Sequence, residues 1–181
     1  MTARARTAVL LLSLVLICDP AAAATMTLTL DDVQIDTCDS PWEEEVCTLQ
    51  VVDTAEGDQS PPGMCVWDQQ PEGVQLLGAR LEIDATSLGG VEEVEVDLQE
   101  NSGSGHTKIT LYDPLGNIIQ FVSSSYTGSP TDQSMPIFIP GSELGKIVIS
   151  GSDALIQEVR LVGELRVGND GNSWSALKTL W

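Results

Sequence analysis

The sequence predicts an all-β protein, an antiparallel β-sandwich or jelly roll of about eight to ten strands. Three observations support this fold class. Apolar and polar residues alternate along several segments, beginning with Met26, Leu28 and Leu30, which are separated by threonines. Candidate strands recur about every 8–14 residues, with Gly, Pro, Asn and Ser between them. No segment carries a helical stripe longer than about two turns, which argues against alternating strands and helices.

Each candidate strand has its own pattern. In residues 94–98 apolar and acidic residues alternate, and in 108–112 Ile109 and Leu111 alternate with polar ones. Such strands bury one face, so Tyr112 falls on the outward side. The remaining candidates are apolar runs between turn residues, at 46–52, 65–67, 74–83, 118–122, 137–139, 146–150 and 155–167. A short helical turn is expected at 41–45, because a proline starts it and acidic residues follow.

The same alternation predicts which side chains face the core. They are Leu28, Leu30, Leu81, Ile83, Val94, Val96, Leu98, Ile109, Leu111, Ile119, Ile147, Ile149, Val159 and Leu161. Residues 113–117, DPLGN, fit a hairpin turn, since Pro114 sets φ and Gly116 or Asn117 accepts a positive φ. We therefore interpret Asp113 as a turn residue rather than a metal ligand.

Residues 1–24 have the pattern of a secretory signal peptide. Arg4 and Arg6 precede an apolar core at 8–17, and residues 21–24 offer an A-x-A cleavage site. This core is shorter than the roughly 20 residues that a membrane span needs. Cys18 leaves a lipoprotein anchor as an alternative, although Ile17 is not the small residue expected before such a cysteine. We expect a secreted or periplasmic chain without stable membrane insertion.

Residues 25–168 form one predicted domain, since this length suits a single core. Segment 31–72 within it is irregular and contains Cys38, Cys47 and Cys65. An exported compartment permits disulfides, and we expect one between Cys38 and Cys47, which closes a short loop. A Cys47–Cys65 disulfide is the alternative. The thiol left over would be buried or would join two chains, so Cys65 offers a route to an oligomer.

Residues 169–181 form a C-terminal tail that contains Trp174 and Trp181. Its simplest interpretation is a frayed terminus. The alternative is an element that covers a sheet edge or docks on a partner, because two tryptophans in so short a stretch are unusual for a free tail. The tail is therefore a second route to an oligomer.

The chain is strongly acidic, with 8 Lys+Arg against 27 Asp+Glu and a formal net charge of −19. Such a surface repels phosphate backbones, which argues against a nucleic-acid partner, and it favours solubility or bound cations. Calcium is the cofactor that this acidity leaves open, with Asp31, Asp32 and Asp153 as candidate ligands in loops. None of them has the spacing of an EF-hand, and Asp in turns also bonds its own backbone.

The sequence lacks the motifs of common enzymes. It has no GxSxG, HExxH or phosphate-binding glycine loop, and its single histidine, His106, lies in a predicted loop. We therefore predict no enzyme, and a hydrolase that uses two of the many carboxylates is the weakest alternative. A sugar-binding face would use exposed aromatic rings that stack on pyranose rings. The candidates are Trp42, Tyr112, Tyr126 and Trp174.

Residues 79–163 carry three patterns in order: VEVDL at 94–98, LYDPLGNII at 111–119 and IVISGSDALIQEVRL at 147–161. In this order the chain resembles the secreted bacterial β-sandwich domains of the galactose-binding, jelly-roll kind, as in PEP-CTERM-type exoproteins. The resemblance implies the fold, with carbohydrate binding, calcium binding or adhesion as expected functions. Two departures matter, because the C-terminal Pro-Glu-Pro sorting signal is absent and segment 31–72 has no counterpart.

These observations together predict a secreted, non-catalytic binding module. Its expected partner is a carbohydrate or another component of a cell surface or extracellular space. The alternative is a structural or adhesive interaction protein of an extracellular assembly.

Overall fold

A computed structural model describes residues 23–30, 41–53, 73–76, 79–100, 104–127, 131–139, 141, 143–168 and 172–173. These residues form strands and their connections. The strands are β1 (Ala24–Thr29), β2 (Trp42–Glu44), β3 (Cys47–Asp53), β4 (Val74–Leu76), β5 (Ala79–Asp84), β6 (Leu88–Glu100), β7 (Ser104–Tyr112), β8 (Ile118–Thr127), β9 (Thr131–Phe138), β10 (Lys146–Gly151), β11 (Ala154–Val167) and β12 (Asn172–Ser173). No helix with the length and hydropathy of a membrane span occurs in this part of the chain.

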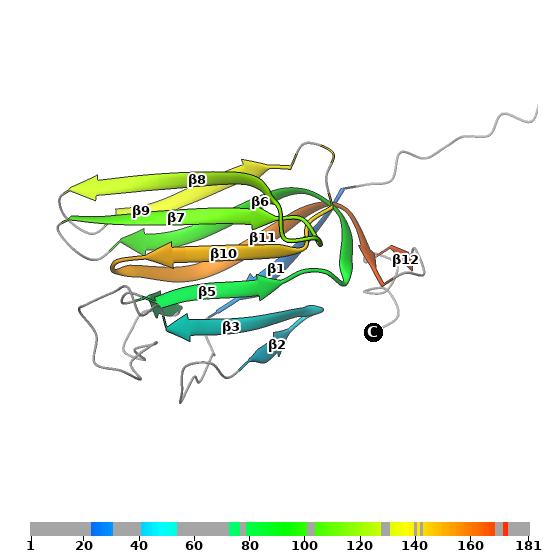
Figure 1. Ribbon diagram of the computed structural model, residues 1–181, viewed down its shortest axis with the longest axis horizontal. Helices are drawn as coiled ribbons and strands as arrows, with labels where there is room; N and C mark the ends of the chain where they lie inside the picture. The colour runs from blue at the N-terminus through cyan, green and yellow to red at the C-terminus, as the bar shows by residue number, and fades with distance from the viewer. Residues whose placement is uncertain are drawn as a thin grey trace, which may run out of the picture.

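The strands form two antiparallel sheets of six strands each. Sheet A has the order β1-β11-β6-β9, and the short strands β4 and β12 also pair with β11. Sheet B has the order β2-β3-β5-β10-β7-β8. Figure 1 shows the strands of sheet B side by side, with those of sheet A behind them. The predicted all-β antiparallel sandwich is therefore confirmed.

The core lies between the inner faces of the two sheets. Burial alternates along the strands, as in β5, where Ala79, Leu81 and Ile83 are buried and the residues between them are not. The residues predicted to face the core are buried, except Ile119, which is partly buried against the core cluster. Each fully enclosed Leu or Ile contributes roughly 1.5–3 kcal/mol relative to an exposed one. The hydrophobic alternation of the sequence thus determines which face of each strand turns inward.

Three local predictions are wrong. His106 lies within strand β7, where it pairs with Ser125 of β8, and not in a loop. The apolar run 74–83 is not one strand but two, because β4 pairs with β11 in sheet A and β5 pairs with β3 and β10 in sheet B. The expected helical turn at 41–45 is an extended strand, β2, which pairs with β3. Glu45 takes a positive φ of 56° in the tight connection between these strands. Pairing with β3 satisfies the backbone groups that a helical turn would have left at its ends.

The expected disulfide between Cys38 and Cys47 is not formed, and neither is the Cys47–Cys65 alternative. Cys47 is a free thiol buried in the core, on the inward side of β3 with Leu49 and Val51. Burial, which is the largest cause, and the nearby carboxylates of Asp84, Glu43 and Glu45 together raise the pKa of this thiol to about 12. Cys38 and Cys65 lie outside the described residues, as do most of the signal peptide and the tail around β12.

Candidate ligand-binding face

Three neighbouring strands of sheet B, β8, β7 and β10, form an outer surface to which they contribute no acidic residue. Strands β7, β8 and β10 contain 9, 10 and 6 residues, and none of these is Asp or Glu in a chain that has 27 of them. We call the outward side chains of these strands the acid-free face. It consists of His106, Lys108, Thr110, Tyr112, Ile118, Phe121, Ser123, Ser125, Lys146, Val148 and Ser150, of which Thr110 is buried.

Two aromatic rings lie on this face. Tyr112 of β7 pairs with Ile118 of β8, and Phe121 pairs with Thr110, so the rings occupy neighbouring strands on the same side. Phe121 is 58% exposed, and Tyr112 is half-buried. The ammonium of Lys108 lies 5.0 Å from the centre of the Phe121 ring. That of Lys146 lies 5.6 Å from the centre of the Tyr112 ring. These cation–π contacts restrict both the lysines and the rings.

The two lysines differ in their charge partners. Lys146 Nζ lies 3.3 Å from Glu82 Oε2, and the other oxygen of this carboxylate lies 2.6 Å from Arg80 Nε. Lys108 makes no ion pair within the described residues. Its neighbours across the sheet are Ser123 on β8 and Ser150 on β10. The acid-free face therefore carries one paired and one unpaired positive charge.

A tight turn fixes the end of the face. Asp113 O accepts a bond of 3.0 Å from Gly116 N, as the predicted hairpin requires. The Asp113 carboxylate accepts hydrogen bonds from Asn117 Nδ2 at 2.8 Å, Asn117 N at 2.8 Å and Leu115 N at 2.9 Å. The bonds from Asn117 contribute most to holding the pKa of Asp113 below its ordinary value. Asp113 therefore belongs to the turn, as the sequence predicts.

The connection between β9 and β10 locks this turn against sheet B. Gly145 N donates to Tyr112 O at 2.8 Å, and Gly145 O accepts from Ala85 N at 2.9 Å. A Cβ at position 145 would lie 2.6 Å from the backbone of Asp113 and Pro114. Only glycine allows so close an approach of two backbones. The position of the Tyr112 backbone thus depends on Gly145.

The structure does not bring together all the aromatic residues predicted for sugar binding. Tyr112 lies on the acid-free face. Trp42 lies opposite Leu49 on the inward side of β2 and packs partly buried against the core, where its Nε1 atom has no hydrogen-bond partner. The backbone of Tyr126 is part of β8, but its side chain lies outside the described residues. Trp174 also lies outside them.

The described residues contain no group of three or more His, Cys, Asp or Glu that could hold a metal ion. Of the predicted calcium ligands, Asp153 lies in the connection between β10 and β11 and accepts a hydrogen bond of 3.0 Å from Gln75 Nε2. This bond ties the connection to β4. Asp31 and Asp32 lie outside the described residues.

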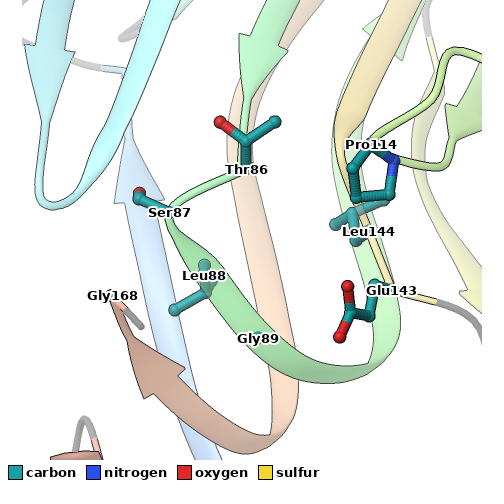
Figure 2. A pocket seen from close by; sticks show the side chains of 8 residues that line it. All are labelled: Thr86, Ser87, Leu88, Gly89, Pro114, Glu143, Leu144 and Gly168. Atoms are coloured by element: carbon teal, nitrogen blue, oxygen red, sulfur yellow. The ribbon is translucent and has the colours of Figure 1, made fainter. Parts of the chain in front are cut away.

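The described residues also line two hollows, and the smaller one includes Pro114 of the β7–β8 turn. One of about 380 Å³ is lined by Thr86, Ser87, Leu88, Gly89, Pro114, Glu143, Leu144 and Gly168, with no aromatic ring among them (Figure 2). The other, of about 640 Å³, has the exposed ring of Phe138, together with the carboxylates of Glu92, Glu143 and Glu164. Arg166 in the latter lies 3.4 Å from Glu164. Both hollows offer less aromatic surface than the acid-free face.

Sequence reasoning missed Phe121, Lys108 and Lys146 as members of one face. The run 118–122 contains four apolar residues, so it shows no alternation. A register irregularity between Leu111 and Tyr112 places Ile118 opposite Tyr112. Such a bulge changes which side chains of β8 point outward. The absence of acidic residues from these segments is the signal that was available in the sequence.

No family model and no curated protein matches the chain. Among solved structures it is similar to a family two carbohydrate esterase from Cellvibrio japonicus, with a TM-score of 0.47 and 10% identity over 81% of this chain and 36% of the esterase. It is also similar to the K2 cleaved adhesin domain of Lys-gingipain, with a TM-score of 0.45 and 9% identity over 76% of this chain and 97% of that domain.

A third similar structure is CsCBM6-3 from Clostridium stercorarium in complex with cellobiose. Its TM-score is 0.37, with 14% identity over 75% of this chain and 92% of that one. The chain spans about a third of the length of the esterase. All three TM-scores are below 0.5, so no activity or ligand is transferred to this chain.

Proposed function

We propose that this protein is an exported, non-catalytic binding module of the galactose-binding-like kind that holds a polysaccharide on the acid-free face. One observation carries the proposal, namely the rings of Tyr112 and Phe121 on neighbouring strands of one outer surface. The C–H face of a pyranose ring packs on such rings, and polar groups beside them orient the sugar hydroxyls. The exposed Ser123 supplies a hydroxyl group beside the rings, whereas Thr110 between them is buried.

The same face favours binding over hydrolysis. A glycoside hydrolase needs two carboxyl groups on either side of the scissile bond. Strands β7, β8 and β10 supply no carboxyl group, because they contain neither Asp nor Glu. A sugar that lies on Tyr112 and Phe121 therefore meets stacking and hydrogen-bonding groups without an acid–base pair.

Affinity electrophoresis in gels that contain single polysaccharides, followed by calorimetry on the best ligand, tests the proposal. We expect retention of the wild-type protein and about tenfold weaker binding for Phe121→Ala or Tyr112→Ala, since each removes one stacking surface. Phe138→Ala is the matched control, because Phe138 is 66% exposed but lies in β9 of sheet A. Equal losses for Phe121→Ala and Phe138→Ala, or no retention by any polysaccharide, would contradict the proposal.

A second candidate function is assembly with other extracellular proteins. It is favoured by the apolar side chains of Leu115, which is 88% exposed, and Ile118, which lies beside Phe121 on the edge strand β8. Exposed apolar groups on a sheet edge promote association between molecules. Sedimentation velocity over a range of concentrations tests this function, and Ile118→Lys should then abolish any species larger than the monomer.

A further inference from the structure

We propose that the polysaccharide is acidic and that Lys108 selects it by pairing its ammonium with a carboxylate or sulfate on the sugar. This inference rests on the proposed function and specifies the ligand class and one specificity-determining residue. It concerns the part of the acid-free face where β8, β7 and β10 lie side by side (Figure 1).

The charge partners of the basic residues single out Lys108. The described residues contain five Lys or Arg side chains, and four of them lie within 3.4 Å of a carboxylate oxygen. These four are Arg80, Lys146, Arg160 and Arg166. Lys108 is the exception within this part of the chain. In a protein with a net charge of −19, a cation without a carboxylate partner is notable.

The sheet register explains why Lys108 is unpaired. Its outward neighbours on β7 are His106 and Thr110, and its partners on β8 and β10 are Ser123 and Ser150. None of these side chains carries a negative charge at neutral pH. A carboxylate or sulfate brought to this position by a ligand would therefore meet the ammonium without competition from an adjacent acidic side chain.

The ammonium is also held close to the stacking surface. Lys108 Nζ lies 5.0 Å from the centre of the Phe121 ring, which restricts a side chain that would otherwise be mobile. A sugar stacked beside Phe121 would place its ring substituents within reach of Nζ. Aromatic contact with the sugar and charge contact with its acidic group thus come from adjacent residues.

On the opposite face of the sandwich the central cation is surrounded by carboxylates, unlike Lys108. Arg160 lies at the centre of the outer surface of sheet A and contacts three carboxylates, at 3.2 Å from Glu95, 2.6 Å from Asp97 and 3.1 Å from Glu158. An anionic ligand would have to displace these groups. Because the whole molecule repels anions, an acidic polysaccharide should bind only where the local charge is positive. Among the described side chains, Lys108 provides that location.

An acidic glycan and its neutral ester have similar shapes but different charges, so comparing them isolates the contribution of charge to binding. We propose calorimetry with an oligogalacturonide, with its neutral methyl ester and with a sulfated glycan, using wild type, Lys108→Gln, Lys108→Arg and Lys146→Gln. We expect Lys108→Gln to weaken binding of the oligogalacturonide or the sulfated glycan about tenfold and to leave the neutral ester unchanged. Lys108→Arg should retain most of the affinity. Lys146→Gln, the control on the same face, should change it less, because Glu82 already neutralises Lys146.

The outcomes distinguish the two proposals. The inference is supported if the wild type binds the acidic glycan more tightly than the neutral ester and if Lys108→Gln loses this preference. Tighter binding of the oligogalacturonide then identifies a carboxylate as the recognised group, and tighter binding of the sulfated glycan identifies a sulfate. Equal wild-type affinity for acid and ester, or unchanged acid binding by Lys108→Gln, overturns the inference while sugar binding stands. Effective competition by polyglutamate overturns it too, because the face would then recognise charge without a sugar. Failure to bind any glycan removes the proposed function and this inference with it.

Discussion

Ser124 of β8 donates a hydrogen bond of 2.9 Å to Oε1 of Glu100 of β6, and this bond joins the inner faces of the two sheets. Glu100 is only 2% exposed. Its other oxygen, Oε2, and the hydroxyl of Thr107, the residue opposite Ser124 on β7, are buried without hydrogen-bond partners. The bond from Ser124 is therefore important, because a buried carboxylate is costly when its oxygens are unsatisfied.

Replacing Ser124 by Ala should destabilise the protein. The change leaves Oε1 of Glu100 buried without its donor, so we expect a loss of about 1–3 kcal/mol in the free energy of unfolding. Urea denaturation measures it. Ser123→Ala on the exposed side of the same strand is the control and should stay within about 0.5 kcal/mol of wild type. Equal effects of the two substitutions would show that the Glu100 bond contributes little.

The buried thiol of Cys47 should make stability fall at alkaline pH. Burial, with a smaller contribution from the carboxylates of Asp84, Glu43 and Glu45, raises its pKa from 9.0 to about 12 in the folded protein. The unfolded thiol ionises first, so its contribution is fully present below pH 9.0 and is lost between pH 9.0 and about 12. Urea denaturation at pH 8 and pH 10.5 measures the loss, which should be smaller in Cys47→Ala. The same slope in both proteins would contradict this assignment.

The same burial predicts low reactivity. A disulfide reagent attacks the thiolate, and the folded protein keeps Cys47 protonated and enclosed. We expect Cys47 to remain unlabelled at pH 8 until urea unfolds the chain, with peptide mapping to identify the labelled cysteine. Rapid labelling of Cys47 in the native protein would show that the thiol is accessible.

The Asp113 carboxylate in the turn that ends the acid-free face should stay ionised to a lower pH than an ordinary aspartate. The pKa of Asp113 lies below its ordinary 3.8, with the Asn117 side-chain bond as the largest cause. A carboxyl group with a lowered pKa stabilises the folded state above pH 3.8, and this contribution is lost as the pH falls through the folded value. Asn117→Ala should raise the pKa of Asp113 in an NMR titration. An unchanged titration midpoint would show that the backbone bonds from Leu115 and Asn117 suffice.

Much of the fold could be predicted from the sequence, because burial of one strand face is a local property. Val94, Val96 and Leu98 turn inward as their spacing indicates, and so do Ile109 and Leu111. The DPLGN turn follows equally from local residue preferences, and the structure places its hydrogen bonds as expected. Both features depend on residues that are close in the sequence.

The predictions that were wrong, and the contacts that were missed, depend on pairing between segments that are distant in the sequence. The run 74–83 looks like one strand because both halves are apolar, yet its halves pair with different sheets. We expected Cys47 to form a disulfide because we predicted an exported chain. Cys47 instead lies on the same side of β3 as Leu49, which places its thiol in the core. Phe121 and Lys108 become neighbours only through the register of β7 and β8. Local patterns do not determine such pairings.

Gly145 offers a test of how the acid-free face is held in place. Gly145→Ala would put a Cβ 2.6 Å from the backbone of Asp113 and Pro114. Backbone atoms cannot move aside as easily as the end of a flexible side chain. We expect a loss of about 1–3 kcal/mol in unfolding free energy and weaker glycan binding, because the Tyr112 carbonyl loses its bond from Gly145 N. Gly89→Ala is the control, since its Cβ would meet nothing nearer than 4.0 Å. If Gly145→Ala keeps wild-type stability and binding, the β9–β10 connection does not position Tyr112.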